Sequence, residues 1–364
     1  MNHGWEKKRW KQVLTIINGK NQNSVEASDG PYPIYGSGGI MGAATQYLCP
    51  EYCTIIGRKG SINKPIFVKS KFWNVDTAFG ISPDTNLIVP KFLYYFCVNY
   101  NFLRHNKATT LPSLVKSDLL EILMPVPSQA VQRQIVLELD KINEMLEVKR
   151  GQLKDLDMLS QSLFYEMFGD PIENPQGWDM KQIQEFAKTT AGGTPSKSHP
   201  EYYNGGKIPW LRSGEVCKMN ISNTELCITD LGMQNSSAKL VPVNSVVVAM
   251  YGATAAQVGV IRSEMTLNQA ISAIFPNSHT KPIFLYFCLS GLKESLLKVA
   301  HGAAQPNISQ AIIKSTKIIL PPISMQEEFS VRVEAIEEQK RVIESTISDL
   351  EVLLASRMDY WFND

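Results

Sequence analysis

An internal repeat constrains the fold of this chain more than any other feature of its sequence. Three short segments of the first copy recur in the second: Gly4-Trp5-Glu6 as Gly177-Trp178-Asp179, Val75-Asp76-Thr77-Ala78 as Leu267-Asn268-Gln269-Ala270, and Tyr95-Phe96-Cys97 as Tyr286-Phe287-Cys288. From position 111 onward, a constant offset of 194 pairs the copies to the end of the chain. The second globular copy is about 21 residues longer, and the order domain, helix, domain, helix predicts a duplication.

The charge of the chain alternates between the same blocks. Residues 1–130 hold 14 Lys and Arg against 8 Asp and Glu, and residues 171–325 hold 13 against 9. The blocks 131–170 and 326–364 are acidic, with 5 against 8 and 4 against 10. Two basic blocks that alternate with two acidic ones indicate two surfaces for a polyanion and two segments that repel it.

Each globular copy has the pattern of a mixed α and β domain. Runs such as Cys53–Ile56 and Ser245–Ala249 are punctuated by Gly, Pro, Asn and Ser, which predicts short strands joined by tight turns. Residues 92–104 and 283–298 are expected to be helical. The fold class is α+β: two pseudo-symmetric domains, residues 1–130 and 171–325, separated by an antiparallel pair of long coiled-coil helices, residues 131–170 and 326–364. Four residues that recur are assigned to the cores, namely Trp5, Trp178, Cys97 and Cys288.

The helices are predicted from apolar residues in alternating steps of four and three. In the first helix these are positions 135, 139, 142, 146, 149, 153, 156, 160, 163 and 167, of which only Lys149 and Ser160 are polar. In the second they are Phe329, Val333, Ile336, Lys340, Ile343, Ile347, Leu350, Leu354, Arg357 and Trp361. A period of about 3.5 residues is typical of coiled coils, and about 38 residues span ~57 Å. Ser324 followed by Glu327 predicts a capping box for the second helix.

Metal chemistry, membrane insertion and secretion find no support in the sequence. The six cysteines form no C-x-x-C pair and no cluster with histidine, which favours reduced structural thiols and no metal site. No apolar run is long enough to cross a membrane, and the N-terminus lacks a signal-peptide pattern, so a cytoplasmic location is expected.

Catalytic motifs for nucleotide or DNA chemistry are also missing. The sequence has no G-x-x-x-x-G-K-[ST] loop and no G-x-G-x-x-G after a strand. Asn174-Pro175-Gln176-Gly177 lacks the second proline and the aromatic residue of an adenine methyltransferase clamp. A Ser/His/Asp triad is not excluded by sequence, but no G-x-S-x-G elbow is present. We therefore predict no catalytic residue in this chain.

Several segments resemble the recognition domains of type I restriction-modification specificity subunits. In the second copy the resemblance lies in Gly193-Thr194-Pro195-Ser196 and in residues 202–215. In the first copy it lies in residues 32–40 and in Gly57-Arg58-Lys59-Gly60-Ser61. The helices that end in Phe168-Gly169-Asp170 and Phe362-Asn363-Asp364 are similar to the spacer repeats of that family, so the resemblance covers nearly the whole chain.

The resemblance implies a DNA-binding subunit with no catalysis of its own. Each domain would read one half of a split, asymmetric double-stranded DNA target, and the helices would set the spacing of the half-sites. The helices would also dock two adenine-N6 methyltransferase (modification) subunits, and restriction and motor subunits would join that core. S-adenosylmethionine and ATP with Mg²⁺ are then expected only in the partner subunits.

The candidate DNA contacts are polar side chains in loops, where a rigid scaffold usually presents its binding residues. In the first copy they are Tyr35, Ser37, Arg58, Lys59, Ser61, Thr109, Thr110 and Ser113. In the second copy they are Thr194, Ser196, Lys197, Arg212, Ser213, Tyr251, Thr254, Gln257, Gln305 and Asn307. Arginine suits guanine, lysine suits phosphate and glutamine suits adenine. Packing competes as an explanation for Tyr251, turn capping competes for Ser113 and Asn307, and residues 58–61 also fit an ordinary basic turn.

Two other classes of function stay open at this point. A DNA methyltransferase or nuclease with unrecognised motifs would transfer methyl groups, or cut DNA, without any partner. A coiled-coil adaptor whose globular ends bind proteins would show no salt-sensitive affinity for duplex DNA.

Overall fold

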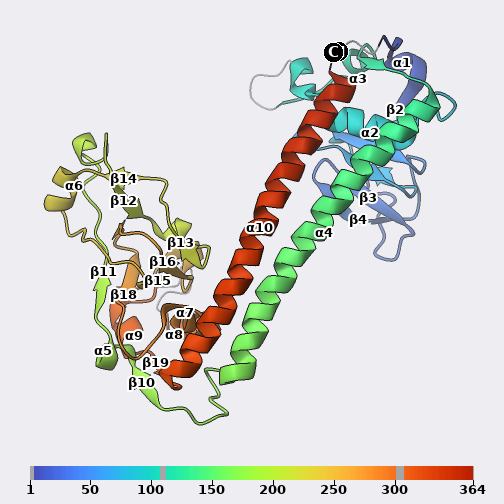
Figure 1. Cartoon of the computed structure of the whole chain (residues 1–364). Coiled ribbons are helices and arrows are strands. Elements are labelled where there is room, and N and C mark those ends of the chain that lie inside the picture. The colour runs from blue at the N-terminus through green and yellow to red at the C-terminus, as the bar shows by residue number, and fades with distance from the viewer. Residues whose placement is uncertain (1–3, 107–111, 301–306, 364) are drawn as a thin grey trace. The chain divides into compact units, whose positions relative to one another are not determined.

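The computed structural model describes residues 4–106, 112–300 and 307–363, and the chain divides into two compact units (Figure 1). Unit 1 comprises Met1–Gly151 with Glu344–Asp364, and unit 2 comprises Gln152–Ile343. The two long helices, α4 (Gln129–Phe168) and α10 (Ile323–Phe362), each contribute one part to each unit. Each unit therefore contains one globular copy and a segment of both helices.

The globular part of unit 1 has three small sheets. A four-stranded sheet has the order β2 (Leu14–Asn18), β8 (Ala78–Pro83), β5 (Cys53–Gly57) and β6 (Ile66–Val68). A three-stranded sheet has the order β4 (Gly39–Ala44), β3 (Tyr32–Gly36) and β7 (Trp73–Asn74), and β1 (Lys7–Arg9) pairs with β9 (Leu123–Pro125). The helices are α1 (Trp10–Val13), α2 (Pro90–Asn99), η1 (Phe102–His105) and α3 (Lys116–Leu119).

Unit 2 repeats this plan with one more strand. The larger sheet has the order β11 (Thr189–Ala191), β18 (Ile271–Ile274), β15 (Val246–Ala249), β16 (Val258–Ile261) and β13 (Asn220–Ile221). The smaller sheet has the order β14 (Cys227–Ile228), β12 (Ile208–Leu211) and β17 (Thr266–Leu267), and β10 (Met180–Gln182) pairs with β19 (Lys317–Ile319). The remaining elements are α5 (Ile183–Phe186), η2 (Pro200–Tyr202), η3 (Ser213–Glu215), α6 (Asp230–Gln234), η4 (Gly252–Thr254), α7 (Pro282–Gly291), α8 (Lys293–Val299) and α9 (Gln310–Ser315). The predicted mixed α and β class is confirmed.

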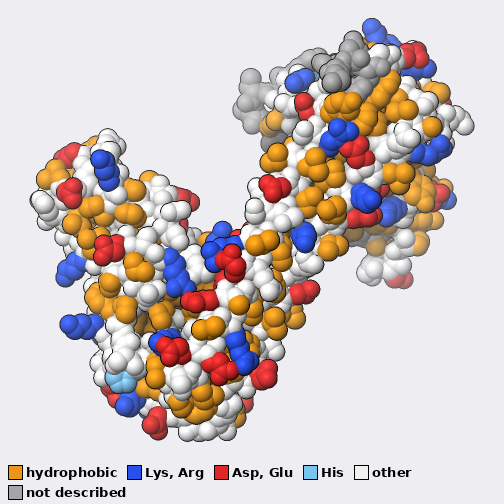
Figure 2. Space-filling model, viewed as in Figure 1, with side chains coloured by type: hydrophobic (Ala, Val, Ile, Leu, Met, Phe, Trp, Pro, Cys, Tyr) orange, Lys and Arg blue, Asp and Glu red, His pale blue; other side chains and the backbone are white. Residues whose placement is uncertain are grey.

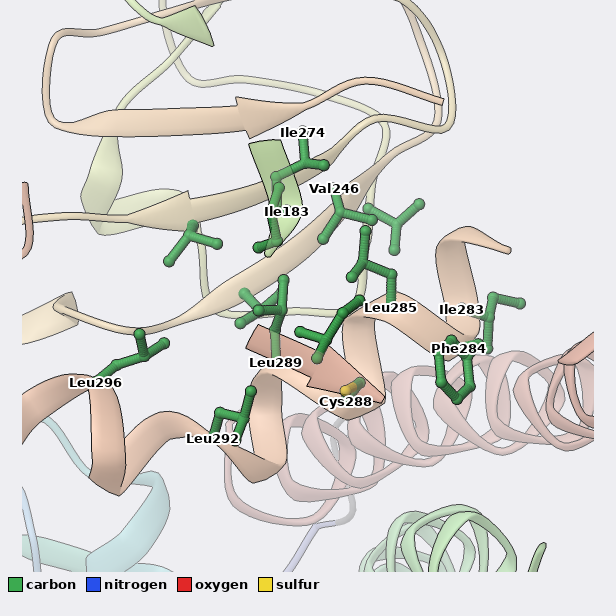
Figure 3. Packing of buried hydrophobic residues seen from close by; sticks show 14 of the residues in the cluster. Ile183, Val246, Ile274, Ile283, Phe284, Leu285, Cys288, Leu289, Leu292 and Leu296 are labelled. Carbon is green, nitrogen blue, oxygen red and sulfur yellow. The ribbon is translucent and has the colours of Figure 1, made fainter. Parts of the chain in front are cut away.

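Each core is closed by an apolar helix that packs between the larger sheet and the long helices. Both α2 and α7 begin with proline at the first turn, where the missing N–H has no intrahelical partner to lose. In unit 2, α7 presents Leu285 and Leu289 toward β15 and β18 (Figure 3), and its Phe284 contacts Phe164 of α4. The predicted core positions Cys97 and Cys288 are fully buried.

The two recurring tryptophans, in contrast, are only half-buried. Trp5 stacks on Trp361 with the ring centroids 5.9 Å apart, and the Trp178 indole N–H donates to the Phe168 carbonyl at 3.0 Å. They lie where the copy meets the end of a long helix and pack against the edge of each core cluster, so their assignment to the cores is confirmed, at the periphery of each core.

The predicted helical seams are confirmed. Every seam position of both helices is buried or half-buried. The helix segments run antiparallel in each unit. In unit 1 Leu146 packs with Leu350 and Glu138 pairs with Arg357. In unit 2 Asp157 pairs with Lys340 at 2.6 Å and Phe164 packs on Phe329.

The predicted capping box of the second helix is wrong, because α10 begins at Ile323 and already includes Ser324. Two buried glutamines instead satisfy backbone groups near the helix starts. The Gln326 amide donates to the Pro321 carbonyl at 2.9 Å, and the Gln132 amide donates to the Pro127 carbonyl at 2.9 Å.

Hydrogen bonds show which residues of the two copies are equivalent. Gly19 N donates to Ala78 O in unit 1, and Gly192 N donates to Ile271 O in unit 2. Val75 N donates to Tyr35 O, and Asn268 N donates to Leu211 O. Val75 is therefore equivalent to Asn268 rather than Leu267, and the repeat read from the sequence is shifted by one residue here. The shift arose because Ala78 and Ala270 were aligned by identity, although they occupy different positions of the turn.

All six cysteines are free, and four of them, Cys49, Cys53, Cys97 and Cys288, are buried. Within the described residues, no helix is long and apolar enough to cross a membrane. The same part of the chain has no cluster of three or more His, Cys, Asp or Glu side chains that could hold a metal ion.

Candidate DNA interface

In unit 1 the predicted loops meet at one edge of the globular copy. Arg58 N and Lys59 N donate to Thr77 O at 2.8 and 3.2 Å, and Leu114 N donates to Arg58 O at 2.9 Å. Lys59 also forms an isolated bridge with Ser113. The turn after β5 is thereby joined to the segment that contains Ser113, although the two are more than 50 residues apart in the sequence.

The β3–β4 hairpin joins the same cluster. The Ser37 hydroxyl lies 3.4 Å from the position that a Cβ on Gly60 would take, so the hairpin turn touches the turn that holds Arg58, Lys59 and Ser61. Gly57 begins this turn, and a Cβ there would lie 2.5 Å from Ser61 O. The sequence Gly-Arg-Lys-Gly-Ser thus folds back on itself only because its first residue has no side chain.

The side chains of this cluster differ in their freedom to contact a ligand. Arg58 and Lys59 are exposed, and the Arg58 guanidinium lies 5.7 Å from the centre of the Phe79 ring. Tyr35 is half-buried with its ring edge-on to Phe72, at 5.5 Å between centroids. Tyr35 is therefore anchored by packing, while the two cations project into solvent.

In unit 2 the equivalent loops also converge. Ile308 N donates to Met250 O at 2.9 Å, and Tyr251 forms an isolated bridge with Asn307, as Lys59 does with Ser113. The Thr194 hydroxyl hydrogen-bonds the Gln269 amide oxygen. The η3 turn with Ser213 contacts the η4 turn with Thr254. These predicted contacts are thus neighbours in the fold.

Other predicted residues of unit 2 are held by intramolecular partners. The Arg212 guanidinium pairs with Glu215 at 3.3 Å and also with Glu225, so its charge is already neutralised. The Ser196 hydroxyl lies 2.7 Å from that of Ser198. The Gln257 carbonyl accepts from Ala249 N at 2.9 Å, so its backbone closes the β15–β16 connection. Lys197 is exposed. The candidates Thr109, Thr110 and Gln305 lie outside the described residues.

Two exposed polar residues beside these loops were not among the candidates from the sequence. Gln269 is exposed and bonded to Thr194, and Asp76, its equivalent one residue after Val75, is also exposed. The signal was present, because both lie in the segment that recurs between the copies. It was read only as evidence of duplication.

The thiols of the cores are poor candidates for chemistry. Burial raises the pKa of Cys288 to about 12 and also raises that of Cys97. A thiol that stays protonated at neutral pH is a weak nucleophile and a weak metal ligand.

The fold and these clusters define a class: a duplicated protein in which one mixed domain occurs twice and presents a cluster of polar loops in each copy. A family model for the type I restriction modification DNA specificity domain matches residues 2–157 and 175–351. The chain therefore belongs to the family of type I restriction modification DNA specificity domains and contains that domain twice, as the resemblance implied.

Named relatives agree with this family. The chain is 27% identical over 227 residues to the EcoR124I/EcoR124II specificity subunit of Escherichia coli, covering 60% of this chain and 52% of that subunit. It is 23% identical over 306 residues to the MjaIX specificity subunit of Methanocaldococcus jannaschii, covering 78% and 69%. The chain thus spans about half the length of the first of these relatives.

Solved structures support the fold. The S subunit of a type I restriction-modification system from M. genitalium matches with a TM-score of 0.63 at 16% identity, over 100% of this chain and 97% of that one. A chain from a study of complex assembly and conformational transition of the type I R-M system matches with a TM-score of 0.60 at 17% identity, over 98% and 96%.

Proposed function

We propose that this chain is the DNA-reading subunit of a type I restriction-modification complex, in which each copy of the domain reads one half of a bipartite, asymmetric double-stranded target. One observation carries this proposal. Equivalent backbone positions hold different polar side chains in the two units: Lys59 and Ser113 in unit 1, Tyr251 and Asn307 in unit 2. Two readers on one frame with different side chains recognise two different sequences.

The long helices are proposed to dock two copies of one methyltransferase subunit. Exposed apolar residues recur on α4 at Leu137, Val148 and Leu159, and on α10 at Val331, Val342 and Leu353, with side chains 44% to 69% exposed. Steps of 11 residues return to nearly the same face of a helix, because 11 residues complete about three turns. The two sets are also related by the offset of 194 that relates the copies.

Met158 and Val352 are also related by the offset of 194, and both are exposed, so they extend the match between the two helices. Figure 2 shows hydrophobic side chains among charged ones on the visible surface of the molecule. Solvated helix faces are usually polar, so apolar residues that repeat between the copies favour a protein partner. A matched pair of patches fits two copies of the same partner.

Catalysis is proposed to reside in the partner subunits. S-adenosylmethionine would then be bound by the methyltransferase subunits, and ATP with Mg²⁺ by restriction and motor subunits. Four of the free thiols, those of Cys49, Cys53, Cys97 and Cys288, are buried, and the exposed polar side chains of the described loops suit binding.

A domain exchange tests the reading function. Replacement of residues 1–130 by the equivalent region of another specificity protein should change one half of the methylated motif, read by methylome sequencing of the host. A change in both halves, or in neither, contradicts the two-reader model. Methylation by the purified chain alone, with labelled S-adenosylmethionine, would instead support a methyltransferase.

A charge inserted into one exposed patch tests docking. Val148→Glu and Val342→Glu occupy matched positions, and each should remove one partner copy, so that native mass spectrometry of the co-purified complex shows one methyltransferase subunit instead of two. The exposed polar position Gln161 supplies the control Gln161→Glu, which should keep both. Retention of both copies in either valine variant would refute docking at these residues.

A further inference from the structure

The two units share a serine–glycine pair at equivalent positions. In unit 1, Ser37 and Gly38 form the two-residue turn between β3 and β4, where Gly36 faces Gly39. In unit 2, Ser213 and Gly214 follow β12. The equivalence rests on hydrogen bonds, because Tyr35 O and Leu211 O each lie two residues before the serine and accept from equivalent residues.

The fold does not require glycine at either position. Neither Gly38 nor Gly214 has a positive φ, and a Cβ built on either would have no atom within 4 Å. Other glycines are different: a Cβ on Gly192 would lie 2.1 Å from Asn268 O. No atom of the protein occupies the space beside Gly38 and Gly214, so the absence of a side chain has no reason within the fold. We therefore consider a ligand outside the protein.

Both pairs present unused hydrogen-bond donors beside this open surface. In a two-residue hairpin turn, the hydrogen bond that closes the turn is donated by the N–H of the residue after the loop, here Gly39. The N–H of Gly38 is then not used in the turn. In unit 2 the η3 turn closes with Glu215 N donating to Arg212 O at 2.9 Å, which leaves the N–H of Gly214 outside that bond. Among the described residues, the hydroxyls of Ser37 and Ser213 also have no hydrogen-bond partner.

A second shared glycine lies next to each pair. Gly60 has φ +75° and Gly252 has φ +76°, so the neighbouring turn has the same left-handed residue in both units. Gly60 lies beside Ser37, and the turn that contains Gly252 contacts the turn that contains Ser213. Each unit thus combines a hydroxyl, an adjacent backbone N–H and two residues without side chains.

The residues around this shared frame differ between the units. Lys59 is replaced by Tyr251, Asp76 by Gln269 and Ser113 by Asn307. Half-sites of different sequence require different base contacts, whereas the phosphate backbone is the same in both. Backbone N–H groups and serine hydroxyls are frequent phosphate donors, and close approach of a phosphate favours glycine.

We propose that Ser37-Gly38 and Ser213-Gly214 each grip a DNA phosphate and position the duplex independently of its sequence, while Asp76 and Gln269 join the divergent residues that read bases. Aspartate accepts from cytosine and glutamine pairs with adenine in the major groove. This inference rests on the proposed DNA-reading function.

The test measures affinity, base preference and stability of the full chain together. The probe is a pool of fluorescent duplexes with randomised half-sites, and bound molecules are sequenced. Gly38→Ala and Gly214→Ala should each weaken binding about ten-fold or more for every sequence, because the added Cβ keeps the phosphate too far from the backbone N–H for a charge-assisted hydrogen bond. The preferred bases should not change. Thermal stability should stay equal or rise, since alanine fits the backbone at both sites.

Two further variants complete the design. Gly151→Ala alters another glycine with no atom within 4 Å, on α4, and should leave DNA affinity unchanged. Gln269→Ala should relax base preference in one half-site.

Unchanged affinity in either glycine variant, or an altered base preference, would overturn the shared phosphate grip. A base preference that Gln269→Ala leaves unaltered would overturn the reading role of that residue. Failure of the wild-type chain to select any sequence would instead count against the proposed function itself.

Discussion

The side chains of Gln132 and Gln326 join each globular domain to a long helix through hydrogen bonds, and their replacement tests this connection. Gln132 is fully buried on α4, and its side chain accepts from Val89 N at 2.8 Å and donates to Leu87 O and Pro127 O at 2.8 and 2.9 Å. Val89 is the N-cap of α2. The glutamine therefore joins the start of α4 to the start of the helix that closes the core.

Gln326 makes the same three contacts in unit 2. It accepts from Lys281 N at 2.9 Å and donates to His279 O and Pro321 O at 3.0 and 2.9 Å. Replacement by methionine keeps the side-chain length and leaves three backbone groups without partners. Each such group costs about 1–3 kcal/mol, and methionine itself is easier to bury than an amide, so we expect a net loss of about 3 kcal/mol per variant.

Urea unfolding of the full chain, followed by circular dichroism and tryptophan fluorescence, measures this loss. Gln132→Met should destabilise unit 1 and Gln326→Met unit 2, each shifting its own transition. The exposed Gln134→Met on the same helix should change stability by less than about 0.5 kcal/mol. A loss below about 1 kcal/mol in both buried variants would refute the view that these glutamines hold the domains to the helices.

Four other predictions follow from the same contacts. Ile142→Ala, in the buried seam with Leu146 and Leu350, should cost about 2–4 kcal/mol in urea unfolding. Asp140→Ala removes the acceptor of Lys91 Nζ at 2.7 Å and of the Tyr95 hydroxyl, and should cost about 1–2 kcal/mol in the same assay after allowance for partial exposure. Burial raises the pKa of Cys288 to about 12 from its ordinary 9.0. The thiol therefore ionises in the unfolded chain first, and the free energy of unfolding should fall as pH rises above about 9. Cys288→Ala should lessen that fall between pH 8 and 10. Ellman's reagent should modify the exposed Cys217 before any buried thiol in the native protein, which mass mapping checks.

The duplication and the helices were predictable because both depend on local periodicity. A 3.5-residue pattern predicts which side of a helix is buried without knowledge of the partner surface. Helix starts were predicted less well. Ser324 and Glu327 match a capping box in sequence, but Pro321 and Pro322 precede them, and Glu327 pairs with Lys281 at 2.6 Å instead. The ion pair with Lys281, and not the local sequence, therefore determines what the Glu327 side chain contacts.

The candidate site was predictable only in part, because loop residues carry no periodicity. Glycine-bounded turns predicted Ser37, Arg58 and Lys59 as loop residues, and the structure brings these two loops together, which the sequence did not predict. The pairing of Arg212 with two glutamates was not visible, since Glu225 is 13 residues away and approaches through a separate turn. The equivalence of Asp76 and Gln269 was not visible in the sequence, because alignment by the two alanines places Asp76 opposite Asn268.

The extra residues of the second copy make a contact with a long helix that has no counterpart in the first copy. The offset between equivalent residues grows from 176 at Ser37 and Ser213 to 192 at Thr54 and Val246, so most of the additional chain lies between these points. That insertion contains β13, and its Asn220 donates to Glu337 of α10 at 2.9 Å and accepts from Arg262 at 2.6 Å.

Unit 1 has no equivalent of β13 among its described strands, and there α2 contacts α4 through Tyr95, Lys91 and Asp140. The insertion therefore supplies a polar connection to the helix that the shorter copy makes elsewhere. The region that follows the shared Ser-Gly pair thus differs in length between the copies, while the pair keeps its place in the fold. Under the proposed phosphate grip, two domains of different size would therefore make the same contacts with the DNA backbone.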